Sequence, residues 1–184
     1  MMSQPAFQLS VYGARIMDSA KLNEWIQVVG IFALVASLIF VGIEVRQNSI
    51  ATRSATNAAV KDAFRELNLV IASSPELAKA AATNAENPDD APPEDQLQML
   101  GMWRALFHIW SNVHRQHLNG TLDPILYDAV VQEVSMYAGN ARGAETVDDA
   151  ERRARHMRWA WESERFIFNL NFQKFVDGIL GIKR

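Results

Sequence analysis

An uninterrupted apolar run from Ile26 to Ile43 constrains this chain more than any other feature of it. Gln27 and Ser37 are the only polar side chains in the run, and twelve of its residues are Ile, Leu, Val or Phe. A helix over this run is about 27 Å long, close to the ~30 Å hydrocarbon core of a bilayer. Its apolar side chains fall on every helical face, unlike those of a surface helix in a globular domain. The run therefore predicts a membrane-spanning helix.

Length and flanking residues separate this prediction from two alternatives. Trp25 and Val45 complete the span, with Trp25 expected at the membrane interface. A buried core helix is the first alternative, but its apolar run is typically only about 10 to 14 residues long. A cleaved signal peptide is the second, but its apolar region of about 7 to 15 residues ends at a small-residue cleavage site. Here Glu44 to Asn48 follow instead, so we predict an uncleaved, single-pass anchor.

The basic residues beside the span favour one orientation. Two precede the span and four follow it closely: Arg15 and Lys21 before, then Arg46, Arg53, Lys61 and Arg65 after. Because positively charged flanks tend to stay in the cytoplasm, we expect the C-terminal domain there. The chain has no cysteine, so no disulfide framework indicates an oxidising compartment.

The remaining chain has the size and composition of one small soluble domain. Its net charge of −3 argues against nucleic-acid binding through bulk electrostatics, so we predict no nucleic-acid partner. We expect three parts: a mobile N-terminal tail (1–21), a transmembrane anchor (22–46) and a soluble helical-bundle domain (47–184). The stretch 87–94 has the Pro-rich, acidic composition of a linker.

Helical periodicity and helix-boundary residues predict an all-α domain of about four to five helices. No Gly or Pro interrupts the chain from Glu44 to Ala72, so the anchor is expected to continue as a stalk. Ser74–Pro75, Pro93 and Asp123–Pro124 mark helix starts, and Gly120 and Gly139 mark helix ends. The predicted helices after the stalk cover 75–86, 93–119, 125–138 and one last helix from about 148 onward. No segment alternates with period two, so no sheet is expected.

Two of these helices carry most of the expected core. The central helix contributes Leu97, Leu100, Trp103, Phe107, Trp110 and Val113, and the last helix contributes Met157, Trp161, Phe168, Phe172 and Phe175. Both sets recur at steps close to the helical repeat. We therefore expect an aromatic core built mainly by these two helices.

Four short motifs also point to a common architecture. They are Asn-Glu-Trp-Ile-Gln (23–27), Arg-Gln-Asn (46–48), Asn-Gly-x-Leu-Asp (119–123) and a closing Trp161 followed by Phe-Gln-Lys-Phe-Val-Asp (172–177). In their order they resemble a loosely defined bacterial family of single-pass membrane proteins with a C-terminal helical domain. The resemblance covers about residues 22–180 and implies a location in the bacterial inner (plasma) membrane. It implies no activity, cofactor or catalytic residue.

His114 and His117 are the candidates for metal binding or proton transfer. They lie three residues apart on the predicted central helix and so on one face of it. The Glu-x-x-His pairs of di-iron bundles and the HExxH motif are absent, so the sequence favours hydrogen-bonded or solvated histidines. We predict no metal site and no cofactor. The alternative is a metal- or small-ligand-binding bundle enzyme in which Asp123 or Glu133 joins the two histidines.

The last helix offers candidate contacts to lipid or to an acidic partner: Arg152, Arg153, Arg155, Arg158 and Trp159. Anionic headgroups attract such a basic run. Acidic residues of the same helix can pair with it equally well, so spacing favours an ordinary solvated face. Trp159 and Trp161 are two residues apart and cannot share a face. One of them is therefore expected at a contact surface or at the membrane interface.

Small residues on the anchor suggest one more contact. Gly30, Ala33 and Ser37 form a stripe that lets a second transmembrane helix, from another protein or a second copy, approach closely. Two function classes follow from the sequence. The favoured one is a non-enzymatic, membrane-anchored module that binds a partner or serves as an accessory subunit of a membrane complex. The alternative is the bundle enzyme that uses His114 and His117.

Overall fold

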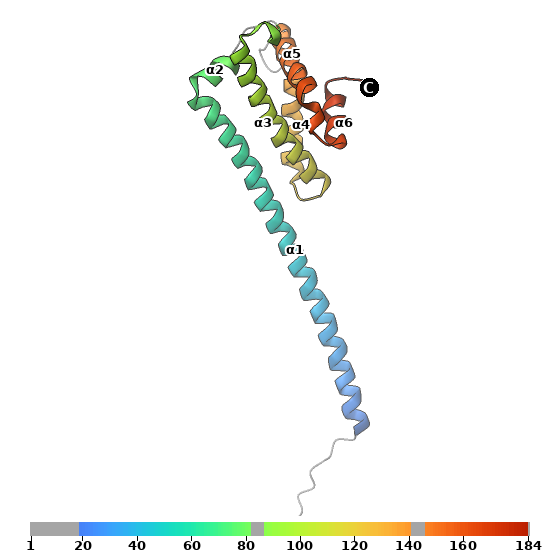
Figure 1. Cartoon of the computed structure of the whole chain (residues 1–184). Coiled ribbons are helices and arrows are strands. Elements are labelled where there is room, and N and C mark those ends of the chain that lie inside the picture. The colour runs from blue at the N-terminus through green and yellow to red at the C-terminus, as the bar shows by residue number, and fades with distance from the viewer. Residues whose placement is uncertain (1–18, 82–86, 141–145, 184) are drawn as a thin grey trace, which may run out of the picture. The chain divides into compact units, whose positions relative to one another are not determined.

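The computed structural model describes residues 19–81, 87–140 and 146–183, and the regular elements among these residues are all helices, with no strand (Figure 1). The predicted all-α class is therefore confirmed. The chain forms two compact units, one ending at Gln47 and the other extending from Asn48 to the C-terminus. Most of the predicted mobile tail lies outside the described residues.

Helix α1 (Ser19–Ser73) contains the apolar run and continues past it, as the absence of Gly and Pro after residue 44 predicted. It begins inside the predicted tail. Its most apolar 18-residue window has a mean hydropathy of 2.6, and none of that window is buried. Phe32 and Leu38 are each 70% exposed. By length and composition this helix is able to cross a membrane.

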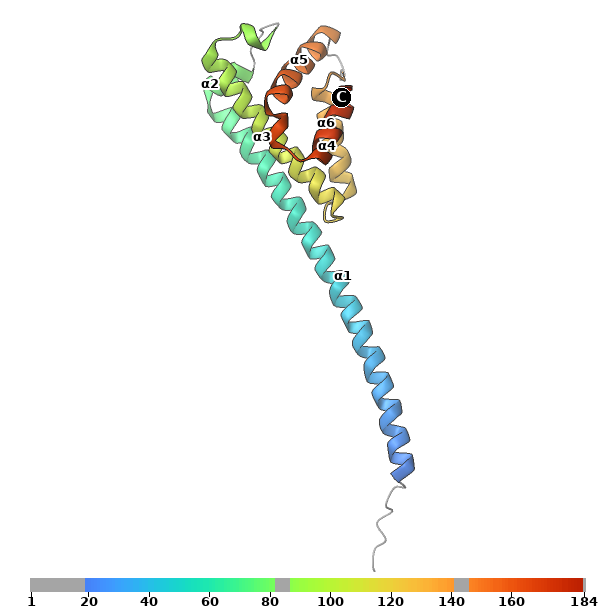
Figure 2. The ribbon, with the colours of Figure 1, turned by 45° about the vertical axis from the view of Figure 1, so that its right-hand side comes forward.

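The unit from Asn48 onward is a small helical bundle around α3. Its elements after α1 are α2 (Pro75–Ala81), the 3-10 turn η1 (Pro88–Asp90), α3 (Pro93–Leu118), α4 (Pro124–Tyr137), α5 (Val147–Glu164), the 3-10 turn η2 (Arg165–Ile167) and α6 (Leu170–Ile179). Helix α3 contacts α2, α4, α5 and α6. Figures 1 and 2 show these helices gathered around it from two directions. The prediction that α3 is the central helix is confirmed.

Local capping interactions explain where these helices begin and end. Side chains at four N-caps each accept a hydrogen bond from a backbone N–H in the first turn of α2, α4, α5 and α6: Ser74, Asp123, Thr146 and Asn169. Helix α3 ends in a Schellman motif, in which the Gly120 N–H donates to the His117 carbonyl and the Thr121 N–H donates to the Gln116 carbonyl. Gly120 takes φ +69° there, a conformation that costs other L-residues.

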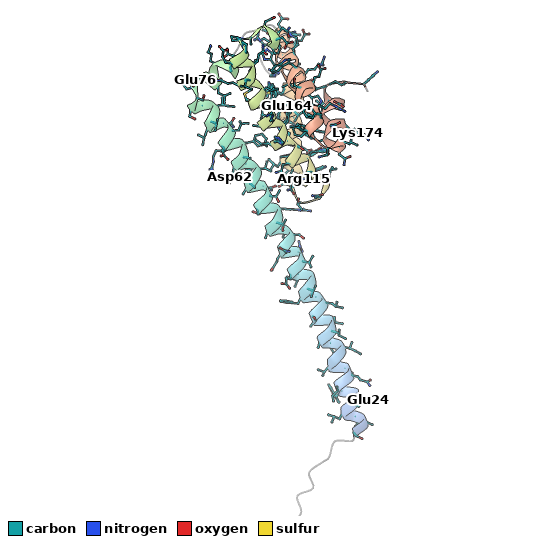
Figure 3. All side chains as sticks on the ribbon, viewed as in Figure 1. Glu24, Asp62, Glu76, Arg115, Glu164 and Lys174 are labelled. Atoms are coloured by element: carbon teal, nitrogen blue, oxygen red, sulfur yellow. The ribbon has the colours of Figure 1, made fainter. Side chains whose placement is uncertain are left out.

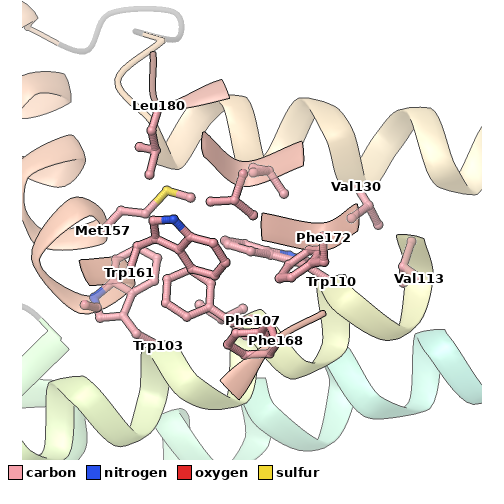
Figure 4. Packing of buried hydrophobic residues seen from close by; sticks show 14 of the residues in the cluster. Trp103, Phe107, Trp110, Val113, Val130, Met157, Trp161, Phe168, Phe172 and Leu180 are labelled. Carbon is pink, nitrogen blue, oxygen red and sulfur yellow. The ribbon is translucent and has the colours of Figure 1, made fainter. Parts of the chain in front are cut away.

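Aromatic side chains dominate the core of the bundle (Figure 4). Six are 7% exposed or less: Trp103, Phe107, Trp110, Trp161, Phe168 and Phe172. The rings of Phe107 and Trp161 meet edge to face, with centroids 5.1 Å apart. Val60 of α1 belongs to the same cluster and is 1% exposed. The second half of α1 is thus an integral part of the bundle.

The predicted last helix is wrong in one respect, because it is broken into α5, η2 and α6. Neither Gly nor Pro causes the break. Asn169 has an extended backbone and caps α6 by accepting from the Phe172 N–H at 3.0 Å. Gln173 Nε2 donates to the carbonyls of Phe168 (2.7 Å) and Arg165 (3.2 Å), which satisfies backbone acceptors exposed by the break.

Two smaller differences concern single boundaries and positions. Leu97, expected in the core, is 72% exposed, because the buried face of α3 runs through Asp95, Met99 and Trp103 and leaves Leu97 on the opposite face. The helix predicted for 75–86 is described to Ala81, and its remaining predicted residues lie outside the described part of the chain.

Candidate functional site

His114 and His117 lie in an aromatic cluster formed by α3, α4 and α6. His114 Nδ1 is 3.0 Å from the Tyr127 hydroxyl, and its ring stacks on Phe175 with centroids 4.6 Å apart. The His117 ring lies parallel to Tyr127, with centroids 3.6 Å apart and planes inclined by 6°. The two histidines therefore share a phenol as their common neighbour.

Burial sets the protonation preferences of this cluster. The pKa of His114 is lowered, first by burial and second by the nearby His117. The pKa of Tyr127 is raised, first by burial and then by Asp128. Both shifts favour the neutral forms, which are the forms that hydrogen-bond to each other without a net charge. The cluster thus suits a neutral hydrogen bond beneath stacked rings.

The carboxylates considered as partners of these histidines have other bonds. Asp123 accepts from the Ile125 N–H at 2.9 Å as the N-cap of α4. Glu133 accepts from the Trp110 indole N–H at 3.2 Å. Within the described residues, no three or more His, Cys, Asp or Glu side chains gather where they could hold a metal ion.

Most basic residues of α5 form hydrogen bonds or ion pairs with other residues of the bundle. Arg153 donates to the carbonyls of Met136 (2.9 Å) and Asn140 (3.3 Å) at the end of α4. Arg158 donates to the carbonyl of Leu180 at the end of α6 (3.2 Å). A guanidinium at a helix C-terminus bonds carbonyls that lack partners within the helix. Arg152 pairs with Asp149 one turn earlier, and Arg155 also has an interaction partner.

Trp159 and Trp161 point in different directions, as their spacing requires. Trp161 is fully buried, whereas Trp159 is only partly buried and packs against a second small cluster of Ala80, Ala91 and Met99. The Trp159 indole donates to Asp89 at 2.8 Å. Trp159 therefore joins α5 to the segment before α3 and keeps one side open to solvent.

Two buried carboxylates that bind arginine side chains were missed by the sequence reasoning. Glu164, labelled in Figure 3, is 4% exposed and receives two hydrogen bonds from Arg104, at 2.6 and 2.7 Å. The Asp177 carboxylate accepts hydrogen bonds from the Trp161 indole N–H at 2.8 Å and from the Arg165 guanidinium at 2.7 Å. These bonds raise the pKa of both arginines. Their partners are 60 and 12 residues apart in sequence, so spacing along one helix could not reveal them.

The Asp177 network fixes a short segment that displays apolar side chains. Phe166, Ile167 and Leu170 lie within the five residues after Arg165 and are 78%, 42% and 69% exposed. The segment is held by the Arg165–Asp177 ion pair and by the Gln173 amide. We call these three residues the η2 tip. Scattered exposed apolar residues are common, but three within five positions on a fixed backbone are typical of a contact surface.

The small-residue stripe of the anchor is open along α1. A Cβ placed at Gly30 would meet no atom within 4 Å. Gly30 and Ala33 line a shallow apolar hollow of about 400 Å³ with Trp25, Ile26 and Val29. The unit that ends at Gln47 thus presents a helix surface on which another helix or lipid chains can pack.

Comparisons of the chain with protein-family models, curated proteins and solved structures found no match. The resemblance to a bacterial family of single-pass membrane proteins therefore stays a prediction.

Proposed function

We propose that this protein is a membrane-anchored helical module of the bacterial inner membrane that binds a partner protein without catalysing a reaction. The span from Trp25 to Val45 holds it in the bilayer, and the bundle from Asn48 onward carries the binding surface. An accessory role in a membrane complex fits this organisation.

One observation carries the membrane part of the proposal. The apolar window of α1 has a mean hydropathy of 2.6 and contributes no buried residue. The twelve Ile, Leu, Val and Phe residues between Ile26 and Ile43 favour insertion by about 4 to 7 kcal/mol on a translocon scale. A core helix of a soluble protein would bury such residues instead. A cleavable signal sequence fits less well, because the same helix continues to Val60, which the bundle core buries.

The orientation follows the charges beside the span. Arg46, Arg53, Lys61 and Arg65 follow it, against Arg15 and Lys21 before it. We place the bundle in the cytoplasm on this basis.

The binding part of the proposal is supported by the η2 tip. Most large aromatic residues of the bundle are buried in its core. Packing within the bundle therefore does not explain Phe166, which is 78% exposed. Aromatic side chains on a fixed backbone are enriched at protein interfaces, where they bury large area at little entropic cost. The histidine cluster, by contrast, is explained by its own stacking and hydrogen bonding.

Alkaline carbonate extraction of bacterial membranes tests the anchor. The full chain is expected in the pellet, as an integral protein. Replacing Leu34 and Leu38 by Arg should release it, because two charges near the bilayer centre cost about 5 to 7 kcal/mol. Recovery of the unaltered chain in the supernatant would refute the anchor.

Photocrosslinking from the η2 tip tests partner binding. A photoreactive phenylalanine analogue at Phe166 should give a discrete crosslinked protein in intact membranes. The same analogue at Val147, which is 67% exposed at the start of α5, is the matched control. Equal or absent crosslinking at the two positions would contradict the η2 tip as the binding surface.

A further inference from the structure

A polar hollow of about 310 Å³ lies where α1 passes the turn between α3 and α4. Its lining is hydroxyl, amide and guanidinium groups from both segments: Asn48, Ser49, Thr52, Arg53, Asn119, Gly120 and Thr121. No acidic side chain lines it. The hollow lies entirely in the unit that begins at Asn48.

Two hydrogen bonds join the α3–α4 turn to α1 at this place. Arg53 Nε donates to the carbonyl of Gly120 at 3.2 Å, and Asn57 Oδ1 accepts from the Asp123 N–H at 3.2 Å. The turn is therefore attached to α1 at Arg53 and Asn57, in the segment after the apolar span.

Arg53 retains the capacity to bind an anion. A guanidinium has five N–H donors, and the bond to Gly120 uses one of them. Among the described residues, no acidic side chain forms an ion pair with Arg53. Arg53 is also the only charged residue between Asn48 and Asn57. Its geometry suits a phosphate group, which a guanidinium binds through two parallel bonds.

Exposed apolar residues neighbour the lining residues of the hollow in the sequence. Leu118 precedes the turn and is 58% exposed, and Ile125 follows it and is 78% exposed. Ile50, within the hollow's α1 segment, is 59% exposed. Polar, basic and exposed apolar side chains occur together where a protein surface meets a bilayer interface.

Chain connectivity keeps the first residue of the hollow, Asn48, close to the end of the span. Asn48 comes three residues after Val45, so even an extended chain keeps their Cα atoms within about 10 Å. The headgroup region adds about 5 to 8 Å to each side of the hydrocarbon core. The first residues of the hollow therefore fall in or next to the headgroup layer if Val45 ends the span.

We propose that the α3–α4 turn is a lipid-contacting surface, in which Arg53 binds the phosphate of an anionic phospholipid and Leu118 and Ile125 enter the headgroup layer. This rests on the membrane anchor of the proposed function. The lining of the hollow agrees with it, since Arg53 is its one charged side chain and the carboxylate of the nearby Asp123 caps α4. In this proposal the bundle contacts the membrane through the α3–α4 turn.

The absence of cysteine makes a direct test simple. The full chain carrying Ile125→Cys is labelled with an environment-sensitive fluorophore and reconstituted into phosphatidylcholine–phosphatidylglycerol vesicles. Lipids with a nitroxide on the headgroup serve as quenchers. Leu97→Cys is the matched control, because Leu97 is 72% exposed and lies on α3 far from the turn.

The expected result is a difference between the two labels. Leu97 and Leu118 are about 30 Å apart along α3, so quenching at position 125 should be at least about threefold stronger than at position 97. Equal quenching at both positions would overturn the lipid-contacting surface. A label at Phe32→Cys, quenched by an acyl-chain nitroxide, reports the anchor separately. Its failure would overturn the anchor and this inference together, whereas its success with equal quenching at 125 and 97 overturns this inference alone.

Variants of Arg53 test the phosphate contact. Arg53→Gln should weaken the quenching at position 125 in vesicles with phosphatidylglycerol, while Arg53→Lys should largely preserve it. Arg65→Gln is the control, because Arg65 is an exposed arginine of the same helix paired with Asp62. If Arg53→Gln and Arg65→Gln have the same effect, Arg53 has no specific part in lipid binding.

Discussion

Removing the Asp177 carboxylate should destabilise the bundle, because the buried indole N–H of Trp161 loses its hydrogen-bond acceptor. Asp177 accepts from the buried Trp161 indole at 2.8 Å and holds the Arg165 guanidinium at 2.7 Å. Asp177→Ala leaves the indole N–H buried without an acceptor, which costs about 1 to 3 kcal/mol. The lost ion pair with Arg165 acts in the same direction. Asp177→Asn keeps an oxygen acceptor for the indole, so we expect a smaller loss.

Urea unfolding of the full chain in detergent, followed by tryptophan fluorescence, measures this effect. Four of the five tryptophans lie in the bundle, so the signal reports its unfolding. Asp62→Ala removes an ion pair whose partners are 63% and 72% exposed, and it should change stability by less than about 0.5 kcal/mol. If Asp177→Ala is as mild as Asp62→Ala, or if Asp177→Asn is the more harmful change, the proposed role of Asp177 is refuted.

Three further predictions concern the core, a helix end and the histidine cluster. Trp110→Ala should cost about 3 to 5 kcal/mol in the same unfolding assay, and a change below 0.5 kcal/mol would contradict its burial. Gly120→Ala should cost about 1 to 2 kcal/mol, because φ +69° is unfavourable for alanine, whereas Gly101→Ala in open helix should be neutral or stabilising. The lowered pKa of His114 makes its contribution to stability fully present above pH about 6.5 and lost as pH falls through the folded-state pKa. His114→Gln should flatten this part of the pH–stability curve, and an unchanged curve would exclude His114 as its source.

Most of the fold follows from local signals that the sequence displays. Pro93 and Gly120 bracket α3, and Asp123–Pro124 begins α4, because caps and prolines act within one helical turn. The break between α5 and α6 was not predicted. Its local signal is Asn169, a favourable N-cap residue three positions before Phe172, but a continuous apolar repeat across 157–175 concealed it.

The candidate sites depended on contacts that spacing cannot reveal. His114 and His117 were recognised as one pair, but their shared neighbour Tyr127 comes from α4. The bond between Arg153 and the end of α4 likewise connects two helices, so the basic run of α5 alone suggested only a charged surface. Side chains that act across helices are identified by packing, which periodicity within one helix does not encode.

Nitroxide scanning along α1 tests the central claim most directly. Single cysteines from Leu22 to Asn48, introduced into the cysteine-free chain, are spin-labelled and reconstituted into vesicles, and their accessibility to oxygen and to a polar nickel reagent is compared. A membrane span predicts that the ratio of oxygen to nickel accessibility rises from Trp25, peaks near Val35 and falls again by Val45. A flat profile, or one that oscillates with the helical repeat without a central peak, would contradict the membrane anchor.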